Sequence, residues 1–185
     1  VSDGSFHAFR SEGDVLTDLG TLGGRSSVGL GINDAGDVAG ASRLDLGAGD
    51  TWFEHAFLYH DGRMVDLGTL SSNYYGTGSR ATDVNNEGDV VGFSGSFTGA
   101  VHGFIYRNGV MTDLNDFLSS EQRNLFSIVE ANGINDSGQI IATAIGSFGS
   151  YHAVLLTPTI PEPSTTALLA IGFGAIAWAR RRKLS

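Results

Sequence analysis

Apolar and polar positions recur along the chain with a period close to 48 residues, and each repeat begins with a short apolar run. HAFRSEGDVLTDLGTL at 7–22 returns as HAFLYHDGRMVDLGTL at 55–70 and as HGFIYRNGVMTDLNDF at 102–117. A fourth start, HAVLL, stands at 152–156. Similarity at a fixed period of this length is typical of repeat architectures, in which each unit is one supersecondary element.

The second repeat shows the strand pattern most clearly. The run HAFLY at 55–59 is largely apolar, as expected of a strand that is covered on both faces. Asp61 and Gly62 then provide a hairpin signal. Further strands are predicted at 64–67, 79–84 and 89–93, so each unit contains about four short strands.

These units predict an all-β repeat domain over residues 1–158. Its units are 7–54, 55–101 and 102–151, and a closing strand follows at 152–157. Four strands in 47–50 residues match a propeller blade, so we predict propeller-like blades. Since propellers usually have at least four blades, the three units form an incomplete ring or the C-terminal part of a larger one. A trefoil-like barrel is the alternative.

One segment of the third unit has some helical spacing. Residues 118–131, LSSEQRNLFSIVEA, place Leu118, Leu125 and Val129 at such intervals. The segment occupies the position where the first two units have a loop and then a strand. We therefore predict a loop followed by a strand there.

A second repeated landmark is a polar turn. It reads GINDAGDVAG at 31–40, DVNNEGDVVG at 83–92 and GINDSGQIIA at 133–142. Asp and Asn oxygens at alternating positions suit Ca²⁺, but local hydrogen bonds and a glycine with positive φ explain the same pattern. The third turn replaces the last carboxylate with Gln139 and keeps the glycine. We therefore favour turns at Gly36, Gly88 and Gly138, keep calcium as the minor alternative, and expect no cofactor.

The repeat also places histidine and aspartate at fixed positions. The histidines that open the units are His7, His55, His102 and His152, and the aspartates are Asp18, Asp66 and Asp113. We interpret each imidazole as a hydrogen-bond donor to neighbouring backbone or Asp rather than as a metal ligand. Paired carboxylates can hydrolyse glycosides, but catalysis needs them in different environments, so a turn or capping role is favoured for the aspartates. His60 falls outside the repeat and is read as exposed loop.

Composition excludes several functions. The chain has no cysteine, so disulfides, thiol nucleophiles and thiolate metal sites are excluded. Residues 1–160 hold nineteen acidic residues and seven arginines, a net charge of −12, which repels phosphate backbones and argues against nucleic-acid binding. No GxSxG, P-loop or HExxH motif is present.

The C-terminal segment, 159–185, has a different character. An apolar run extends from Ala167 to Ala179, and a helix of this run with two more residues would span roughly 22 Å, short of a hydrocarbon core of about 30 Å. Snorkelling basic side chains can extend such a helix, so we predict one short transmembrane helix rather than an amphipathic or buried one. The basic cluster after it would stay cytoplasmic and leave the body outside: Arg180, Arg181, Arg182 and Lys183.

Pro161, Glu162 and Pro163, the short hydrophobic run and the arginine cluster together resemble the PEP-CTERM sorting signal of Gram-negative bacteria. The resemblance implies an exported protein that an exosortase recognises at these three residues and processes after a transient anchorage in the inner membrane. It also implies a signal peptide, a pattern that the residues from Val1 onward do not show.

The body resembles the extracellular HAF repeat family through its His-Ala-Phe, DLGTL and GIND stretches. This resemblance implies export but no activity. We therefore expect an exported cell-surface or extracellular-matrix protein with a binding or structural role, and not an enzyme. Exopolysaccharide or another surface protein is the expected partner, contacted through loop aromatics at Trp52, Phe53, Tyr74 and Tyr75. A secreted glycan-acting enzyme on the same scaffold is the alternative.

Overall fold

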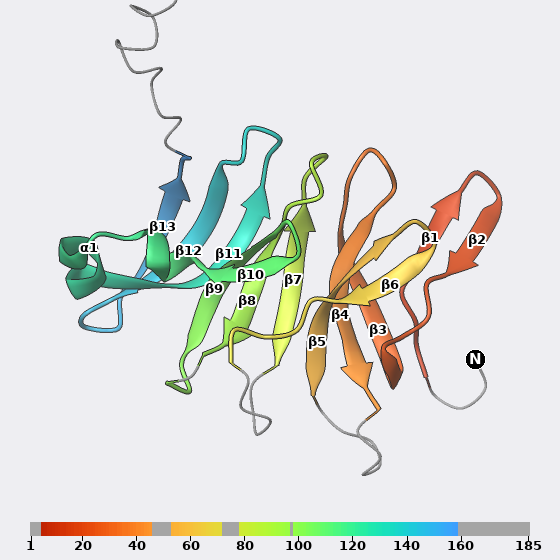
Figure 1. Ribbon diagram of the computed structural model, residues 1–185, viewed down its shortest axis with the longest axis horizontal. Helices are drawn as coiled ribbons and strands as arrows, with labels where there is room; N and C mark the ends of the chain where they lie inside the picture. The colour runs from red at the N-terminus through yellow and green to blue at the C-terminus, as the bar shows by residue number, and fades with distance from the viewer. Residues whose placement is uncertain (1–4, 46–52, 72–77, 97, 159–185) are drawn as a thin grey trace, which may run out of the picture.

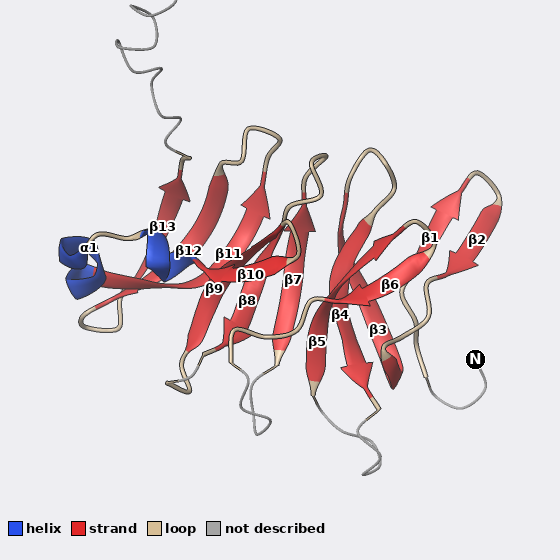
Figure 2. Cartoon of the chain, viewed as in Figure 1, coloured by secondary structure: helices blue, strands red, loops and turns tan. Residues whose placement is uncertain are grey.

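The computed structural model describes residues 5–45, 53–71, 78–96 and 98–158. These residues form four separate antiparallel sheets that stand side by side along the longest axis of the molecule (Figures 1 and 2). The first sheet is a hairpin, the second and third have four strands each, and the fourth has three. An all-β fold, as predicted from the strand pattern, is therefore confirmed.

The strands follow one another in chain order within each sheet. The first two sheets consist of β1 (Phe9–Glu12) and β2 (Val15–Asp18), then β3 (Gly23–Ile32), β4 (Val38–Leu44), β5 (Glu54–His60) and β6 (Arg63–Asp66). The third and fourth consist of β7 (Ser79–Val84), β8 (Val90–Gly95), β9 (Val101–Arg107) and β10 (Val110–Asp113), then β11 (Phe126–Ile134), β12 (Ile140–Gly146) and β13 (Tyr151–Leu156).

The tight hairpins lie where the sequence predicted them. At the β5–β6 turn Asp61 and Gly62 have φ of 49° and 75°, and at the β9–β10 turn Asn108 and Gly109 have φ of 53° and 82°. Two consecutive residues with positive φ match the right-handed twist of the flanking strands. These dipeptides fix the register of the last two strands of each four-stranded sheet.

The sheets keep the period of the sequence repeat but are shifted by about half a unit. They span 23–66, 79–113 and 126–156, whereas the sequence units begin at the histidines. From the second unit on, each histidine strand is the third strand of its sheet, and β1–β2 corresponds to the last two strands of the next sheet, β5–β6. The closing strand predicted at 152–157 is β13, which pairs with β12 as the third strand of the last sheet.

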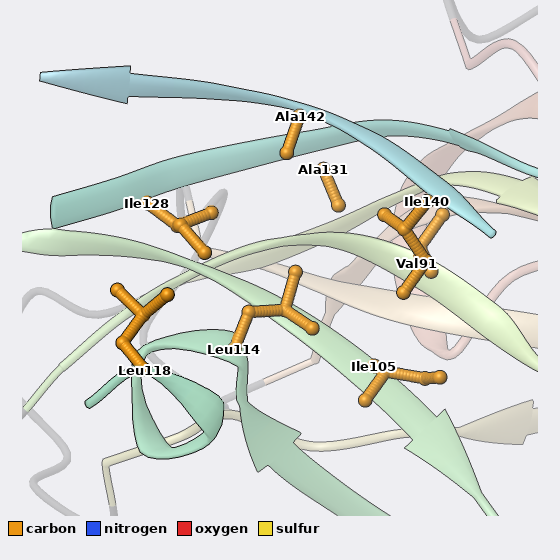
Figure 3. Packing of buried hydrophobic residues seen from close by; sticks show 8 residues of the cluster. All are labelled: Val91, Ile105, Leu114, Leu118, Ile128, Ala131, Ile140 and Ala142. Carbon is orange, nitrogen blue, oxygen red and sulfur yellow. The ribbon is translucent and has the colours of Figure 1, made fainter. Parts of the chain in front are cut away.

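Consecutive sheets pack face to face through three apolar clusters. The cluster between the third and fourth sheets is drawn in Figure 3 and includes Val91, Ile105, Ile128 and Ala142. Equivalent clusters join the first sheet to the second and the second to the third. The described strands do not close into a barrel, so the trefoil-like alternative is wrong.

The first two of these interfaces along the chain also contain a buried hydroxyl that joins two sheets. Ser79 Oγ of β7 accepts a hydrogen bond from the Ala56 amide (2.8 Å) and donates to the Gly68 carbonyl (2.5 Å). Ser27 makes the equivalent bonds with the amide of Ala8 and the carbonyl of Gly20. These bonds satisfy backbone groups that the interface would otherwise bury unpaired.

For residues 118–131 the predicted strand is present, but the loop predicted before it was wrong, because most of that loop is helical. A 3₁₀-helix η1 (Leu114–Phe117) is followed by a short helix α1 (Ser120–Leu125), and only then does β11 begin. Ser119 caps α1, because its side chain accepts from the Gln122 amide while the Gln122 side chain accepts from the Ser119 amide. This reciprocal cap stabilises six residues as a helix.

The predicted transmembrane helix and sorting residues at 159–185 lie outside the described residues. Within the described part of the chain, neither helix has the length and apolar character needed to cross a membrane.

Candidate functional site

Three histidine–aspartate pairs recur at the same place in successive sheets. Nδ1 of His7 lies 2.9 Å from a carboxylate oxygen of Asp18. The corresponding distance is 2.9 Å for His55 and Asp66, and the third pair is closer. In each pair the histidine lies at or just before the start of one strand of a hairpin and the aspartate ends the other. The imidazole–aspartate contact is one of the two roles that the sequence predicted for these histidines.

The third pair is His102 and Asp113, with 2.6 Å between Nδ1 and the carboxylate. Asp113 also caps η1, since its Oδ1 accepts from the Asn115 amide at 2.8 Å. Asp18 and Asp66 accept in the same way from the amides of Gly20 and Gly68. The aspartates therefore have the capping role predicted for them, and they direct the chain out of the outer strand toward the next sheet.

The surroundings shift the acidity of two of these carboxyls in the same direction. The Gly20 amide and the His7 imidazole both hydrogen-bond Asp18 and hold its pKa below the ordinary value. Burial of Asp66 opposes ionisation, but the bonds from His55 and Gly68 outweigh it, so its pKa is lowered as well. These bonds therefore favour the ionised form of both carboxylates.

The fourth histidine has a different partner. Nε2 of His152, the second residue of β13, lies 3.0 Å from Oγ of Ser150 in the turn before that strand. The residue eleven positions after His152, where the other repeats place the aspartate, is Pro163. The last repeat therefore lacks the sequence for a fourth pair at that spacing.

A shallow cavity of about 520 Å³ opens beside the third pair. Its polar lining comes from Ser96, Thr98, His102, Asp113 and Asp116, and its apolar lining from Leu70 and Met111. A volume of this size accommodates a small ligand, and hydroxyls and carboxylates beside apolar side chains are suited to a sugar or another small polyol.

The three polar turns lie together along one edge of the stack, at the top of Figure 1. Gly36, Gly88 and Gly138 have φ of 80°, 80° and 72°, in agreement with the turn interpretation. In each turn the leading asparagine side chain accepts a bond from the amide four residues later, at 2.9 Å. These asparagines, which the sequence analysis did not single out, are Asn33, Asn85 and Asn135.

The turns are joined to one another by hydrogen bonds between sheets. Nδ2 of Asn33 donates to the Asn85 carbonyl (3.0 Å), and Nδ2 of Asn85 donates to the Asn135 carbonyl (3.2 Å). Asn86 stands between two carboxylates, donating through Nδ2 to Asp34 (2.8 Å) and to Asp136 (2.9 Å). Its Oδ1 accepts from the Asp34 amide, and its own amide donates to Asp136. We call these bonds between the turns the turn ladder.

The last residue of the first two turns binds a cation-forming side chain of the third strand of its sheet. Asp37 accepts from Nδ1 of His60 at 2.8 Å, which raises the pKa of His60 above its ordinary value. Asp89 accepts from Nε of Arg107 at 2.8 Å and also from its Nη2, and these bonds raise the pKa of Arg107. His60 is exposed, as predicted, but it is the last residue of β5 and not part of a loop.

The carboxylates of the turns thus already accept hydrogen bonds from protein groups. The residues of the turn edge present Asp34, Asn86 and Asp136 to solvent at intervals set by the spacing of the sheets. Among the aromatic residues predicted to contact a partner, Phe53 is half-buried. Trp52, Tyr74 and Tyr75 lie outside the described residues, as do the sorting motif and the basic cluster.

Sheet order, repeated interfaces and the turn ladder define an all-β repeat protein of stacked antiparallel sheets. The chain belongs to the family described as "Protein of unknown function (DUF3466)", which matches residues 22–154. The match begins one residue before β3 and ends within β13, so it covers the three larger sheets and leaves out the β1–β2 hairpin.

The PEP-CTERM protein-sorting motif matches residues 159–183. The sorting signal predicted from the sequence is confirmed by this match, which implies recognition by an exosortase, export and sorting to the cell surface. No curated protein and no solved structure matches the chain.

Proposed function

We propose that this chain is a cell-surface or extracellular-matrix protein that binds or builds surface material after an exosortase has processed its C-terminus. The observation that carries the proposal is the sorting motif at 159–183 behind an all-β body. In this proposal the segment spans the inner membrane as a short helix, with the basic cluster on the cytoplasmic side.

We further infer that the sheets are consecutive blades of a propeller-like arrangement. Support comes from the chain order of the strands in each sheet, the face-to-face packing and the recurrence of the same interface. The turn ladder supports the same arrangement, because it joins the β3–β4, β7–β8 and β11–β12 turns in sequence order. The His-Ala-Phe resemblance is in line with an exported repeat of this kind.

A binding role is favoured over catalysis because the histidine–aspartate pairs are nearly equivalent. A general acid and a nucleophile need carboxyls whose environments push their pKa values apart, whereas the pKa values of Asp18 and Asp66 are shifted the same way by the same kinds of bond. The cavity beside His102 provides the candidate binding position.

The partner in this proposal is a neutral polysaccharide of the cell surface. The net charge of −12 on residues 1–160 repels acidic polymers. Sugar hydroxyls would bond the polar lining of the cavity, namely Ser96, Thr98 and Asp116, while Leu70 and Met111 would cover an apolar sugar face.

The sorting part of the proposal is tested in a Gram-negative host with and without a functional exosortase. We expect cleavage within 159–185 and release of the body only when the exosortase is present, measured by the mass of the C-terminal peptide. Replacing both Pro161 and Pro163 with Ala should abolish processing, whereas Pro158→Ala, just upstream of the motif, should not. Equal processing of the parent, the Pro161 and Pro163 double variant and the Pro158→Ala variant would refute the sorting part of the proposal.

The binding part is tested with purified protein and the neutral polysaccharide of the same host. We expect co-sedimentation that Asp116→Ala weakens at least several-fold, without any change in polymer length. Asp34→Ala, at the turn edge, is the matched control and should bind normally. Shortening of the polymer would instead establish the glycan-acting alternative.

A further inference from the structure

Each sheet of the stack has two different faces. The leading face carries the residue two positions after the histidine, Phe57 or Phe104 in the four-stranded sheets and Val154 in the last, and there it packs against the preceding sheet. Phe57 is fully buried in the cluster with Ala8, and Phe104 is fully buried in the cluster with Ala56. The opposite, trailing face carries the small residue that follows the histidine, because the next sheet presses closely on it. At Gly103 an added Cβ would lie 2.9 Å from the Ile128 side chain of that sheet.

The β1–β2 hairpin exposes its leading face. Phe9 is equivalent to Phe57 and Phe104, yet it is 63% exposed. Leu16, equivalent to Met64, is 66% exposed, whereas Met64 packs against the cluster between the first two sheets. The described chain thus displays at this end the apolar pair that its inner sheets bury.

The last sheet exposes its trailing face at the other end. Ile141 is equivalent to Val91, which is fully buried, and Leu155 is equivalent to Ile105, which is 6% exposed. Ile141 and Leu155 stand opposite each other on β12 and β13 and are 57% and 61% exposed. Ala153, equivalent to Ala8 and Ala56, is exposed beside them.

The two faces lie at opposite ends of the stack in Figure 1, so neither covers the other within one described chain. We propose that a second copy of this chain docks head to tail, with the β1–β2 leading face of one copy on the β12–β13 trailing face of another. Phe9 of one copy then meets Ala153 of the next, as Phe57 meets Ala8 and Phe104 meets Ala56 inside each chain. The contact continues an interface that the chain already builds three times.

The second copy is the occupant that these residues specify, because the trailing face keeps the small residue that admits a phenylalanine. A leading face on one end and a trailing face on the other also make the contact heterologous, so copies form a closed ring or an open filament. The proposal concerns assembly and is independent of the polysaccharide proposed above.

The test uses the full-length chain in detergent micelles and exploits its lack of cysteine. Two preparations carry different affinity tags. One has Phe9→Cys, the other has Ala153→Cys, and the two are mixed with a short thiol-specific crosslinker. We expect a heterodimer that contains both tags, since each copy has a single thiol. Crosslinking should fall on dilution, and Leu155→Asp in the Ala153→Cys chain should reduce it at least tenfold.

The matched control mixes Phe9→Cys with Phe148→Cys, a fully exposed residue in the β12–β13 loop. This mixture should give no crosslinked heterodimer, because Phe148 lies outside the docked face, and this result separates face-to-face docking from association through the C-terminal segment. The proposal is overturned if the Phe9 and Ala153 variants do not crosslink when mixed, if the Phe148 control crosslinks equally, or if either variant alone dimerises as well as the mixture. Because all substituted positions are exposed, unchanged circular dichroism should accompany each variant.

Discussion

Asn86 is the residue on which the turn ladder depends, and replacing it with Asp tests the ladder directly. Its Nδ2 donates to Asp34 and to Asp136 at 2.8 and 2.9 Å. In Asn86→Asp both donated bonds are lost and an oxygen anion faces two others. Asn86→Ala loses the same donors without adding charge and is therefore the control.

The magnitude follows from the contacts. Each lost hydrogen bond at this exposed site costs about 1 kcal/mol. Asn86→Ala loses the two donated bonds and the bond that Oδ1 accepts from the Asp34 amide, so its expected loss is about 3 kcal/mol. Asn86→Asp keeps an accepting oxygen and loses only the two donated bonds, which cost about 2 kcal/mol. Two like-charge contacts at roughly 4 Å add about 1 kcal/mol each in a water-like medium. We therefore expect Asn86→Asp to lower the free energy of unfolding by about 4 kcal/mol at pH 7.

The assay is denaturant unfolding of the full chain in detergent between pH 3 and pH 8, with chelator or calcium. The introduced carboxyl should have a raised pKa in the folded state, because its neighbours are anions. The folded state then binds more protons, so the extra loss of stability should appear as pH rises and vanish in acid. Equal stability of Asn86→Asp and Asn86→Ala at pH 7 would refute the ladder. Stabilisation of the parent by calcium would establish a metal loop instead.

Three further predictions use the same unfolding measurement. Gly31→Ala should cost about 2 kcal/mol, since an added Cβ would lie 2.7 Å from Cα of Asp83 in the next sheet; unchanged stability would show that the inner strands are not in close contact. The pKa of His60 is raised in the folded state, so its ion pair with Asp37 stabilises the fold below the ordinary histidine pKa of about 6.5. This stabilisation is lost as pH rises through the folded-state pKa, so the denaturant midpoint of the parent should fall over that range, and His60→Gln should not show this fall. Phe104→Ala should cost about 3–5 kcal/mol, whereas Phe9→Ala, measured in dilute protein, should cost well under 1 kcal/mol; similar costs would contradict the assignment of buried and open faces.

The strands were predictable from the sequence because their signals are local. Hairpin dipeptides such as Asp61-Gly62 and alternating runs bound β5 to β8 closely, and the period of the repeat became the period of the sheets. The offset between the sequence units and the sheets was not predictable. The connections at 45–53 and 67–78 are of similar length, and nothing in them decides whether β5 pairs with β4 or with a later strand.

In the candidate site, too, the features set by short local motifs were predictable and those set by contacts between distant residues were not. The turns at Gly36 and Gly88 were predictable from short motifs, as was a hydrogen-bonding role for the histidines. The turn ladder was not, because it joins residues about 50 positions apart in sequence, such as Asn33 and Asn85. Besides the helical spacing of Leu118 and Leu125, a signal for α1 was Ser119 followed three residues later by Gln122, a capping box, but the comparison with the loops of the first two units outweighed both.

The third turn has Gln139 where the first two have aspartate, and the structure explains this difference within the chain itself. Asp37 holds His60 and Asp89 holds Arg107, both five residues after the histidine of their repeats. The corresponding residue after His152 is Thr157. Both members of the pair are therefore neutral in the last sheet, which avoids leaving one charge without its partner. A calcium ligand would have no reason to change with the residue on the neighbouring strand, so this joint replacement favours a structural role for the turn carboxylates.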